Sequence, residues 1–281
     1  MTLVEADLDV FDKEAFLNPK LAVLPDGAEL LSPGVWALRE RNRLLKAGSN
    51  VKMAEAEAMR FVAAKTTIPV PEVYESYMQD ELGYIFMSKI EGDLLGDVWC
   101  SLTDEQKSFV VAQMRDYVDQ LSSLHGEFYG SLWHQPCRDV FFGHWPFKPV
   151  KLAYGPYYTR KEYNDALILA LANSTPTGTV EGLGELVERL SAITDESKVF
   201  SHGDLHPGNI LVDKSSGRVV SIIDWGGAGF SVRGREYYEA RARSGPASWK
   251  SALDAIFTES ARAHFELLHE IDQAMRKWTL I

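Results

Sequence analysis

Apolar and polar positions in the first third of the chain follow a pattern that predicts short strands around one helix. Four strands are expected, at Val35–Leu38, Arg43–Lys46, Val73–Tyr77 and Tyr84–Ile90. Apolar residues recur at helical spacing over 53–65, and the prolines that follow end this helix. Residues 1–34 hold several Pro and Gly residues, which favours an irregular entry segment with short helical pieces.

After Gly92 the apolar residues recur mainly at helical spacing. Thr103 and Gln106 form a capping-box pattern, and a helical apolar stripe follows it. Further helical periodicity covers 162–172, 183–193 and 247–278, the last as one or two helices. A β-hairpin interrupts these helices, with strands at Asn209–Asp213 and Val219–Asp224 and a turn at Lys214–Gly217.

Strands followed by helices predict an α+β chain with two lobes. The N-lobe is expected to be small and β-rich over residues 1–90, and the C-lobe larger and helical over 91–281. A ligand between two lobes is the usual arrangement for such a chain.

Composition and charge narrow the classes of function. The 281 residues are 46% hydrophobic and 25% charged, as in an ordinary globular protein. Lys plus Arg number 29 and Asp plus Glu number 40, so the net charge is −11. This acidity argues against a nucleic-acid partner, because neutralising phosphates needs a basic surface. It is compatible with a cationic small molecule or a metal-bound one.

The expected compartment is the cytoplasm. Two cysteines, Cys100 and Cys137, are too few for a disulfide scaffold. The first residues carry acidic groups where a signal peptide needs positive charge. No apolar run approaches the length of a membrane span, so no membrane partner is expected.

The candidate chemistry lies around the predicted hairpin, in Ser201–Asn209 and Ile222–Trp225. Asp204 and Asn209 are separated by a loop that contains Pro and Gly. The hairpin brings Asn209, at the start of one strand, close to Asp224, at the end of the other. Two such oxygen donors, with phosphate oxygens supplying the rest, suit Mg²⁺. Asp204 beside them is a carboxylate that can accept a hydroxyl proton.

This constellation resembles the machinery of protein-kinase-like phosphotransferases, His-Arg-Asp-x-x-x-x-Asn followed by a metal-binding Asp. Here His202-Gly-Asp204 has Gly in place of Arg. The variant is similar to the aminoglycoside phosphotransferase and choline kinase group, most closely the fungal-type aminoglycoside phosphotransferase-like proteins. The resemblance implies a two-lobed kinase-like fold and transfer of the γ-phosphoryl group of ATP or GTP to a small-molecule hydroxyl. It implies Asp204 as the catalytic base, and Asn209 and Asp224 as ligands of Mg²⁺.

The resemblance also implies nucleotide-binding residues in the N-lobe. Lys46 matches the strand lysine that holds the α- and β-phosphates. Glu55 is expected to pair with this lysine, and Glu57 is the alternative, since the two point about 200° apart on a helix. Backbone groups from Ser88 to Ile90 would meet the purine edge, although a plain strand leading into a turn predicts the same residues.

Two departures from the family pattern keep a second hypothesis open. Only Leu31–Gly34 stands where a glycine-rich phosphate loop is expected, and Gly226 replaces a Glu that usually follows the Trp. The alternative is therefore a catalytically weak or inactive kinase-like binding module. A facial-triad iron site built on His202 and Asp204 would leave Asn209 and Asp224 without a role.

The acceptor is not identified by the sequence. Residues 128–163 hold 11 aromatic side chains, which predict either an acceptor pocket for a cation or aromatic amine or a loop packed by its own rings. Glu236 and Glu239 stand where related proteins place acids near a cationic acceptor, and a solvated helix face explains them equally well. Choline-like, amino-alcohol, sugar and secondary-metabolite hydroxyls are all open as acceptors, and so is a protein side chain.

Overall fold

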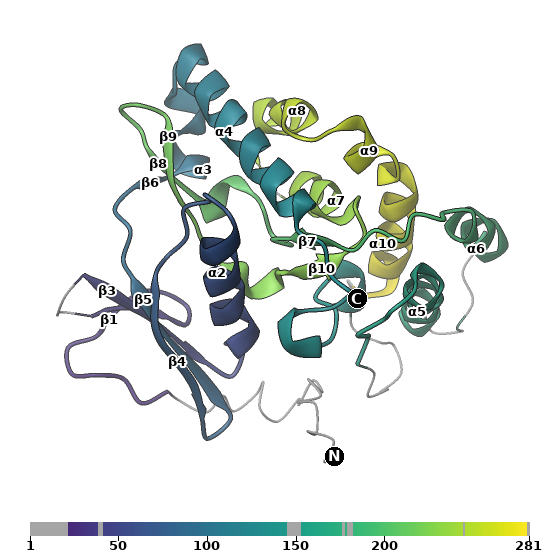
Figure 1. The fold of residues 1–281 in the computed structure, drawn as a ribbon, viewed down its shortest axis with the longest axis horizontal. Helices are drawn as coiled ribbons and strands as arrows, with labels where there is room; N and C mark the ends of the chain where they lie inside the picture. The colour runs from purple at the N-terminus through teal and green to yellow at the C-terminus, as the bar shows by residue number, and fades with distance from the viewer. Residues whose placement is uncertain are drawn as a thin grey trace.

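One antiparallel sheet and one helix form the first part of the molecule (Figure 1). The computed structural model describes residues 22–38, 42–144, 153–175, 178, 182–243 and 245–279. The sheet has the order β1-β2-β3-β5-β4, and α2 (Met53–Lys65) lies against it between β3 and β4 in the chain. The strands are β1 (Glu29–Ser32), β2 (Val35–Leu38), β3 (Arg43–Gly48), β4 (Val73–Gln79) and β5 (Leu82–Ser88).

The four expected strands and the helix over 53–65 are confirmed. The strand β1 was not predicted, because its residues all lie exposed and carry no alternating pattern. The helical pieces expected before residue 22 fall outside the described residues.

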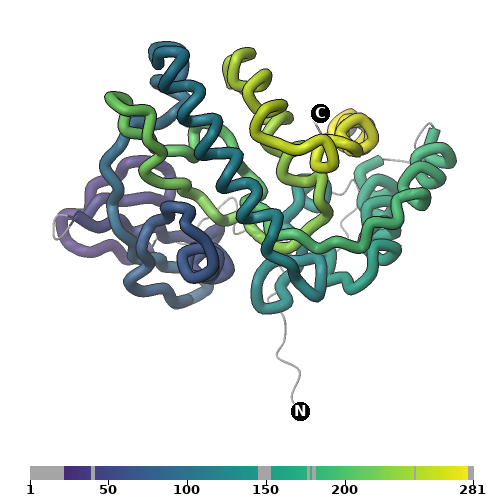
Figure 2. Tube along the Cα trace, turned by 45° about the horizontal axis from the view of Figure 1, so that its top comes forward, coloured from purple at the N-terminus to yellow at the C-terminus, as the bar shows by residue number. Residues whose placement is uncertain are grey.

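Helices make up most of the remaining chain, and their coils can be followed in Figure 2. Short strands lie between them in the sequence. α4 (Asp104–Ser123) begins at the capping box that Thr103 and Gln106 form, as predicted. The longer helices after it are α5 (Arg160–Asn173), α6 (Leu183–Ser191), α7 (Arg235–Ala242), α8 (Ala247–Ile256) and α10 (Phe265–Thr279). Short helical segments are α3 (Leu95–Val98), α9 (Glu259–Arg262), η1 (Trp99–Ser101), η2 (Leu132–His134), η3 (Val140–Phe142), η4 (Pro207–Asn209) and η5 (Trp225–Gly227).

Two small sheets hold the predicted chemistry in place. β8 (Ile210–Asp213) and β9 (Arg218–Ile222) form the predicted hairpin, and β6 (Asp93–Leu94) extends it. β7 (Val199–Ser201) pairs with β10 (Gly229–Ser231). The two ends of segment 202–228, which contains the candidate residues, are therefore held side by side. Residues 247–278 form three helices and not the one or two expected, and α7 was not predicted.

The largest hydrophobic cluster joins the sheet-bearing part of the chain to the helical part. It contains Val62 and Ile85 from the first part together with Val118, Ile222 and Trp249 from the second. A second cluster lies farther along, among α5, α6 and α10. Through the largest cluster, the sheet-bearing part and the helical part of the chain share one core. None of the helices in the described part of the chain is both long and apolar enough to cross a membrane.

Candidate active site

The ends of the β8–β9 hairpin bring Asn209 and Asp224 to one place. Ile210 pairs with Ile222 in the antiparallel ladder, and one residue further out the Ile223 N–H donates to the Asn209 carbonyl at 2.9 Å. Asp224 follows directly and has a left-handed backbone, φ 62° and ψ 66°. Such a conformation is strained in a residue with a side chain, and strain of this kind is concentrated at functional sites.

Asp204 is fixed beside Asn209 by side-chain contacts. The Asn209 amide Nδ2 donates to the Asp204 carbonyl oxygen at 2.9 Å and to Asp204 Oδ2 at 3.2 Å. The other carboxylate oxygen, Oδ1, lies 2.8 Å from Arg243 Nε and 3.8 Å from His206 Nε2. Asp204 therefore presents one oxygen to Asn209 and the other to two nitrogen donors.

His202 braces this loop from inside. Its side chain is fully buried, and its ring lies edge-on to Trp225 with 4.5 Å between centroids. Nδ1 accepts from the Asp204 N–H at 3.1 Å, so the proton of the neutral ring is on Nε2, which donates to the Ile223 carbonyl at 3.0 Å. Burial lowers the pKa of His202 to about 4, which keeps the ring neutral.

Two residues at the start of α7, Arg235 and Glu236, form hydrogen bonds with the same region. The buried Glu236 carboxylate accepts from the N–H groups of His202 and Gly203. Burial raises the pKa of Glu236 to about 7. Arg235 donates to the Gly227 carbonyl at 2.7 Å, and a Cβ at position 203 would lie 2.3 Å from Arg235 Nη2. With φ +79° as well, this position requires glycine where protein kinases have Arg.

Lys46, on β3, lies between two carboxylates. Its Nζ is 2.7 Å from Glu55 Oε1 and 2.7 Å from Asp224 Oδ1. Glu57 instead pairs with Arg60 on its own helix, so Glu55 is the partner of Lys46. Burial alone would lower the pKa of Lys46, but the two carboxylates raise it above its usual value. Burial likewise works against the charged form of Asp224, and the Lys46 ammonium lowers the pKa of this carboxyl below its usual range.

The residues expected to meet a purine lie at the end of β5. The Ser88 N–H already donates to the Glu72 carbonyl at 2.9 Å, and Ser88 Oγ accepts from the Glu72 N–H. No hydrogen bond among the described residues uses the backbone of Ile90. The Ser88 N–H is therefore already engaged in a hydrogen bond within the protein.

The donors at the hairpin fit a magnesium ion. A carboxylate and a side-chain amide at the same end of a hairpin are oxygen donors of the kind that Mg²⁺ takes when phosphate oxygens complete the shell. The described residues contain no cluster of three His, Cys, Asp or Glu side chains able to hold a metal. Gly226 leaves room here, since a Cβ on it would stand 3.5 Å from Glu55 Oε2 and 3.6 Å from Asp224 Oδ1.

The aromatic residues of 128–163 that the structure describes mostly pack on one another. Tyr129 and Tyr163 are fully buried with 5.1 Å between ring centroids, and Phe142 stacks on Tyr154 at 4.8 Å. Trp145 and Phe147 lie outside the described residues. The arrangement favours the interpretation of a loop packed by its own rings.

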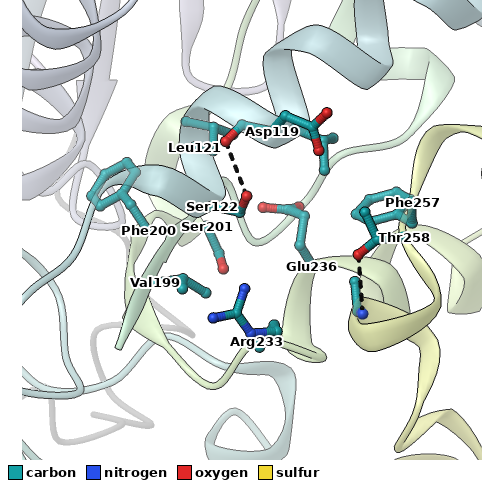
Figure 3. Close-up of a pocket in the computed structure, with 12 residues that line it drawn as sticks. Asp119, Leu121, Ser122, Val199, Phe200, Ser201, Arg233, Glu236, Phe257 and Thr258 are labelled. Atoms are coloured by element: carbon teal, nitrogen blue, oxygen red, sulfur yellow. Dashed lines mark hydrogen bonds between the residues drawn. The ribbon is translucent and has the colours of Figure 1, made fainter. Parts of the chain in front are cut away.

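The two glutamates considered for a cationic acceptor are buried, and their carboxylate oxygens contact other groups of the protein. Glu236 is engaged with the loop, and Glu239 pairs with Arg235 at 3.1 Å and accepts from the Val140 N–H at 2.7 Å. Figure 3 shows a pocket that Glu236 lines together with Ser201 and Arg233. None of the residues predicted for catalysis, nucleotide binding or metal binding lines this pocket.

Comparison with known proteins identifies the class. A family model described as the phosphotransferase enzyme family matches residues 38–268, and the chain belongs to this family. Two curated relatives, subtelomeric hrmA-associated cluster proteins of two Aspergillus fumigatus strains, are 23% identical over 251 residues. Each match covers 62% of this chain and 49% of the relative, so the chain spans about half the length of the curated relatives it matches.

Solved structures share the fold. Aminoglycoside phosphotransferase APH(2")-IIa, in a ternary complex with streptomycin and ATP, is 15% identical and has a TM-score of 0.58; the match covers 97% of this chain and 91% of that one. APH(3'')-Id from Streptomyces rimosus, in complex with ADP and streptomycin, is 17% identical with a TM-score of 0.53, covering 89% and 92%. The expected α+β, two-lobed kinase-like fold and the resemblance to this family are confirmed.

Several residues of the site had no signal in the sequence. Arg235 and Arg243 reach the loop from α7 and from the residue after it, and α7 itself was not predicted. A run of charged residues gives no local sign that its members are buried against a loop far away in the sequence.

Proposed function

We propose that the chain transfers the γ-phosphoryl group of ATP or GTP to a hydroxyl of a small molecule in a Mg²⁺-dependent reaction. The observation that carries this proposal is the convergence of four residues, which an ion pair and hydrogen bonds hold together: Lys46, Asp224, Asn209 and Asp204. Family membership supports the same reaction class. Two of the structural neighbours were solved with ATP or ADP and streptomycin, which supports a nucleotide donor and a small-molecule acceptor.

Each residue has a role in this proposal. The nucleotide binds between residues 1–90 and 91–281, with its purine edge near Ile90 and its α- and β-phosphates on Lys46. Glu55 holds Lys46 in place. Asn209 and Asp224 would hold Mg²⁺, which neutralises charge on the phosphates when it is bound. Asp204 orients the acceptor hydroxyl and takes its proton.

A catalytically weak or inactive kinase-like binding module is the second candidate. It is favoured by the tight turn between β1 and β2, where Pro33 and Gly34 alone separate the strands. So short a turn offers few backbone N–H groups to phosphates, in contrast to a glycine-rich loop.

Thermal unfolding with ATP or GTP, each with and without Mg²⁺, tests the nucleotide site. A ligand at 100 times its dissociation constant adds about 2.7 kcal/mol to the free energy of unfolding. For a chain of this size this raises the melting temperature by roughly 5–10 °C. The shift should need both nucleotide and Mg²⁺ and be lost in Asp224→Asn. It should persist in Asp165→Asn, which removes an exposed carboxylate from α5. No shift in the unaltered protein would contradict the proposal.

Phosphoryl transfer from labelled ATP to a panel of alcohols separates the two candidates. Asp204→Asn should keep the nucleotide shift and lose transfer by about 100-fold or more, since general-base catalysis contributes 10²–10⁴-fold. Nucleotide binding without transfer to any alcohol would favour the binding module. Undiminished transfer by Asp204→Asn would overturn the assignment of the base.

A further inference from the structure

Arg243 covers the carboxylate that is proposed to act as the base. It directly follows α7, and its Nε lies 2.8 Å from Asp204 Oδ1. This oxygen is shielded from solvent and has no hydrogen bond among the described residues. The Arg243 side chain is 47% exposed and that of Asp204 is 24% exposed. The guanidinium thus stands between Oδ1 and the solvent.

Oδ1 is the oxygen that remains for an acceptor hydroxyl. The other oxygen, Oδ2, accepts a hydrogen bond from Asn209. His206 flanks Oδ1 on the loop, with Nε2 at 3.8 Å. Its Nδ1 accepts from the Gly208 N–H at 3.1 Å, so the neutral ring carries its proton on Nε2. Two nitrogen donors therefore face the position that an acceptor must enter.

The same region offers no free carboxylate from α7 to an ammonium group. Glu236 and Glu239 are buried, and their oxygens are used by loop N–H groups and by Arg235. A guanidinium binds carboxylate or phosphate groups well and repels cations. The charge beside Asp204 therefore favours an acceptor with a negative group.

We propose that the acceptor is an alcohol that also carries a carboxylate or a phosphate, and that Arg243 binds this anionic group. This inference rests on the proposed function. Binding draws the guanidinium from Asp204 to the acceptor and uncovers Oδ1. The hydroxyl oxygen then forms its bond to the γ-phosphorus, the bond from this phosphorus to the bridging oxygen breaks, the nucleoside diphosphate leaves, and the hydroxyl proton passes to Asp204. Cationic alcohols meet the like charge of Arg243 and are poor acceptors.

Calorimetric titration of the protein loaded with Mg²⁺ and a non-hydrolysable ATP analogue tests the inference. The probes are glycerate and glycerol 3-phosphate, compared with the neutral glycerol and the cationic choline. Either anionic probe should bind at least about tenfold more tightly than glycerol or choline. Comparing glycerate with glycerol 3-phosphate shows whether Arg243 binds a carboxylate or a phosphate. Arg243→Gln should reduce this binding by about 10- to 100-fold, and Arg243→Lys by less. Arg218→Gln, at the start of β9, removes one positive charge elsewhere and should leave the binding of the probes unchanged.

Transfer assays complete the test. With the best anionic acceptor, Arg243→Gln should raise KM and leave the Mg²⁺–nucleotide thermal shift intact. Tighter binding of choline than of both anionic probes, equal binding by the unaltered protein and Arg243→Gln, or no anionic binding at 10 mM would each overturn the acceptor assignment. If the nucleotide shift is present in these cases, the proposed function still stands. If the shift itself is absent, the proposed function fails.

Discussion

Lys46 contacts two carboxylates, one from α2 and one from the end of the hairpin. The contacts distinguish sharply between the neighbouring glutamates, because Glu55 is buried against Lys46 and Glu57 pairs with Arg60 near the surface. This difference allows a matched test of the proposed phosphate-binding lysine.

Replacing Glu55 by Gln should weaken the binding of Mg²⁺–ATP about tenfold, a loss of about 1.4 kcal/mol, because Lys46 then loses its charged anchor. Stability should change little, since burial of the Glu55 carboxylate is itself unfavourable and raises its pKa. Calorimetry on Glu55→Gln and Glu57→Gln checks this, with the second expected within about twofold of the unaltered protein. Equal losses in both variants would contradict the role of Glu55.

The buried neutral ring of His202 predicts a specific acid sensitivity. The unfolded chain takes up this proton near pH 6.5, whereas the folded chain takes it up near pH 4. Between these values the unfolded state binds one more proton, so stability falls as the pH falls from 6.5 to 4. The contribution of His202 over this window is about 3 kcal/mol.

Urea unfolding between pH 4 and 7.5 measures this contribution as the difference between the unaltered protein and His202→Gln. The difference removes the opposite pH dependence expected from Glu236, whose pKa is raised. If the variant does not fold, NMR of the imidazole in the unaltered protein gives the same information. A His202 ring that takes up its proton near pH 6.5 would show the prediction to be wrong.

At the scale of elements, the loop that carries Asp204 and the turn at η5 depend on two glycines in different ways. A Cβ on Gly203 would lie 2.4 Å from the Gly227 carbonyl oxygen as well as against Arg235, and φ there is +79°. A Cβ on Gly226 would make only ordinary contacts with Glu55 and Asp224. Gly203→Ala should therefore cost more than about 3 kcal/mol and abolish transfer.

Gly226→Ala serves as the control and should keep transfer within about threefold of the unaltered protein. Unfolding by denaturant and the transfer assay measure both variants. A stable, active Gly203→Ala protein would mean that the loop can move away from Arg235, which the packing does not lead us to expect.

Elements with strong local signals could be predicted, and those held by distant contacts could not. The β8–β9 hairpin was predicted because two apolar runs flank a polar turn, and its ends then placed Asn209 and Asp224 together. α7 was missed because Arg235, Glu236 and Glu239 are charged yet buried, which reverses the usual pattern. The contact of Arg243 with Asp204 depends on where α7 ends and has no local signature.

For the whole molecule, the shared core predicts cooperative unfolding. The largest hydrophobic cluster contains residues of α2 and β5 together with residues of α4, β9 and α8. Unfolding of one lobe would expose the apolar surface of the other, so both should unfold in one transition. Urea transitions followed by tryptophan fluorescence and by far-UV circular dichroism should have the same midpoint, and two separated midpoints would contradict this expectation.

The fold class was predictable because the spacing of apolar residues indicates the order of strands and helices. This order restricts the possible architectures. The shared core was not predictable, since it depends on which faces of distant elements meet. Phe61 on α2 illustrates this, with its ring 5.0 Å from that of Phe200 on β7 and 6.0 Å from that of Phe230 on β10.

The packing of Phe61 has a consequence for control of the protein. In protein kinases the helix that carries the lysine-pairing glutamate moves to switch activity on and off. Here that helix packs against the second lobe through Phe61 and through its contact with η5, and Glu55 on it lies 2.7 Å from Lys46. We therefore expect α2 to keep this position whether or not a nucleotide is bound. A switch that works by moving this helix is not expected to control the proposed transfer.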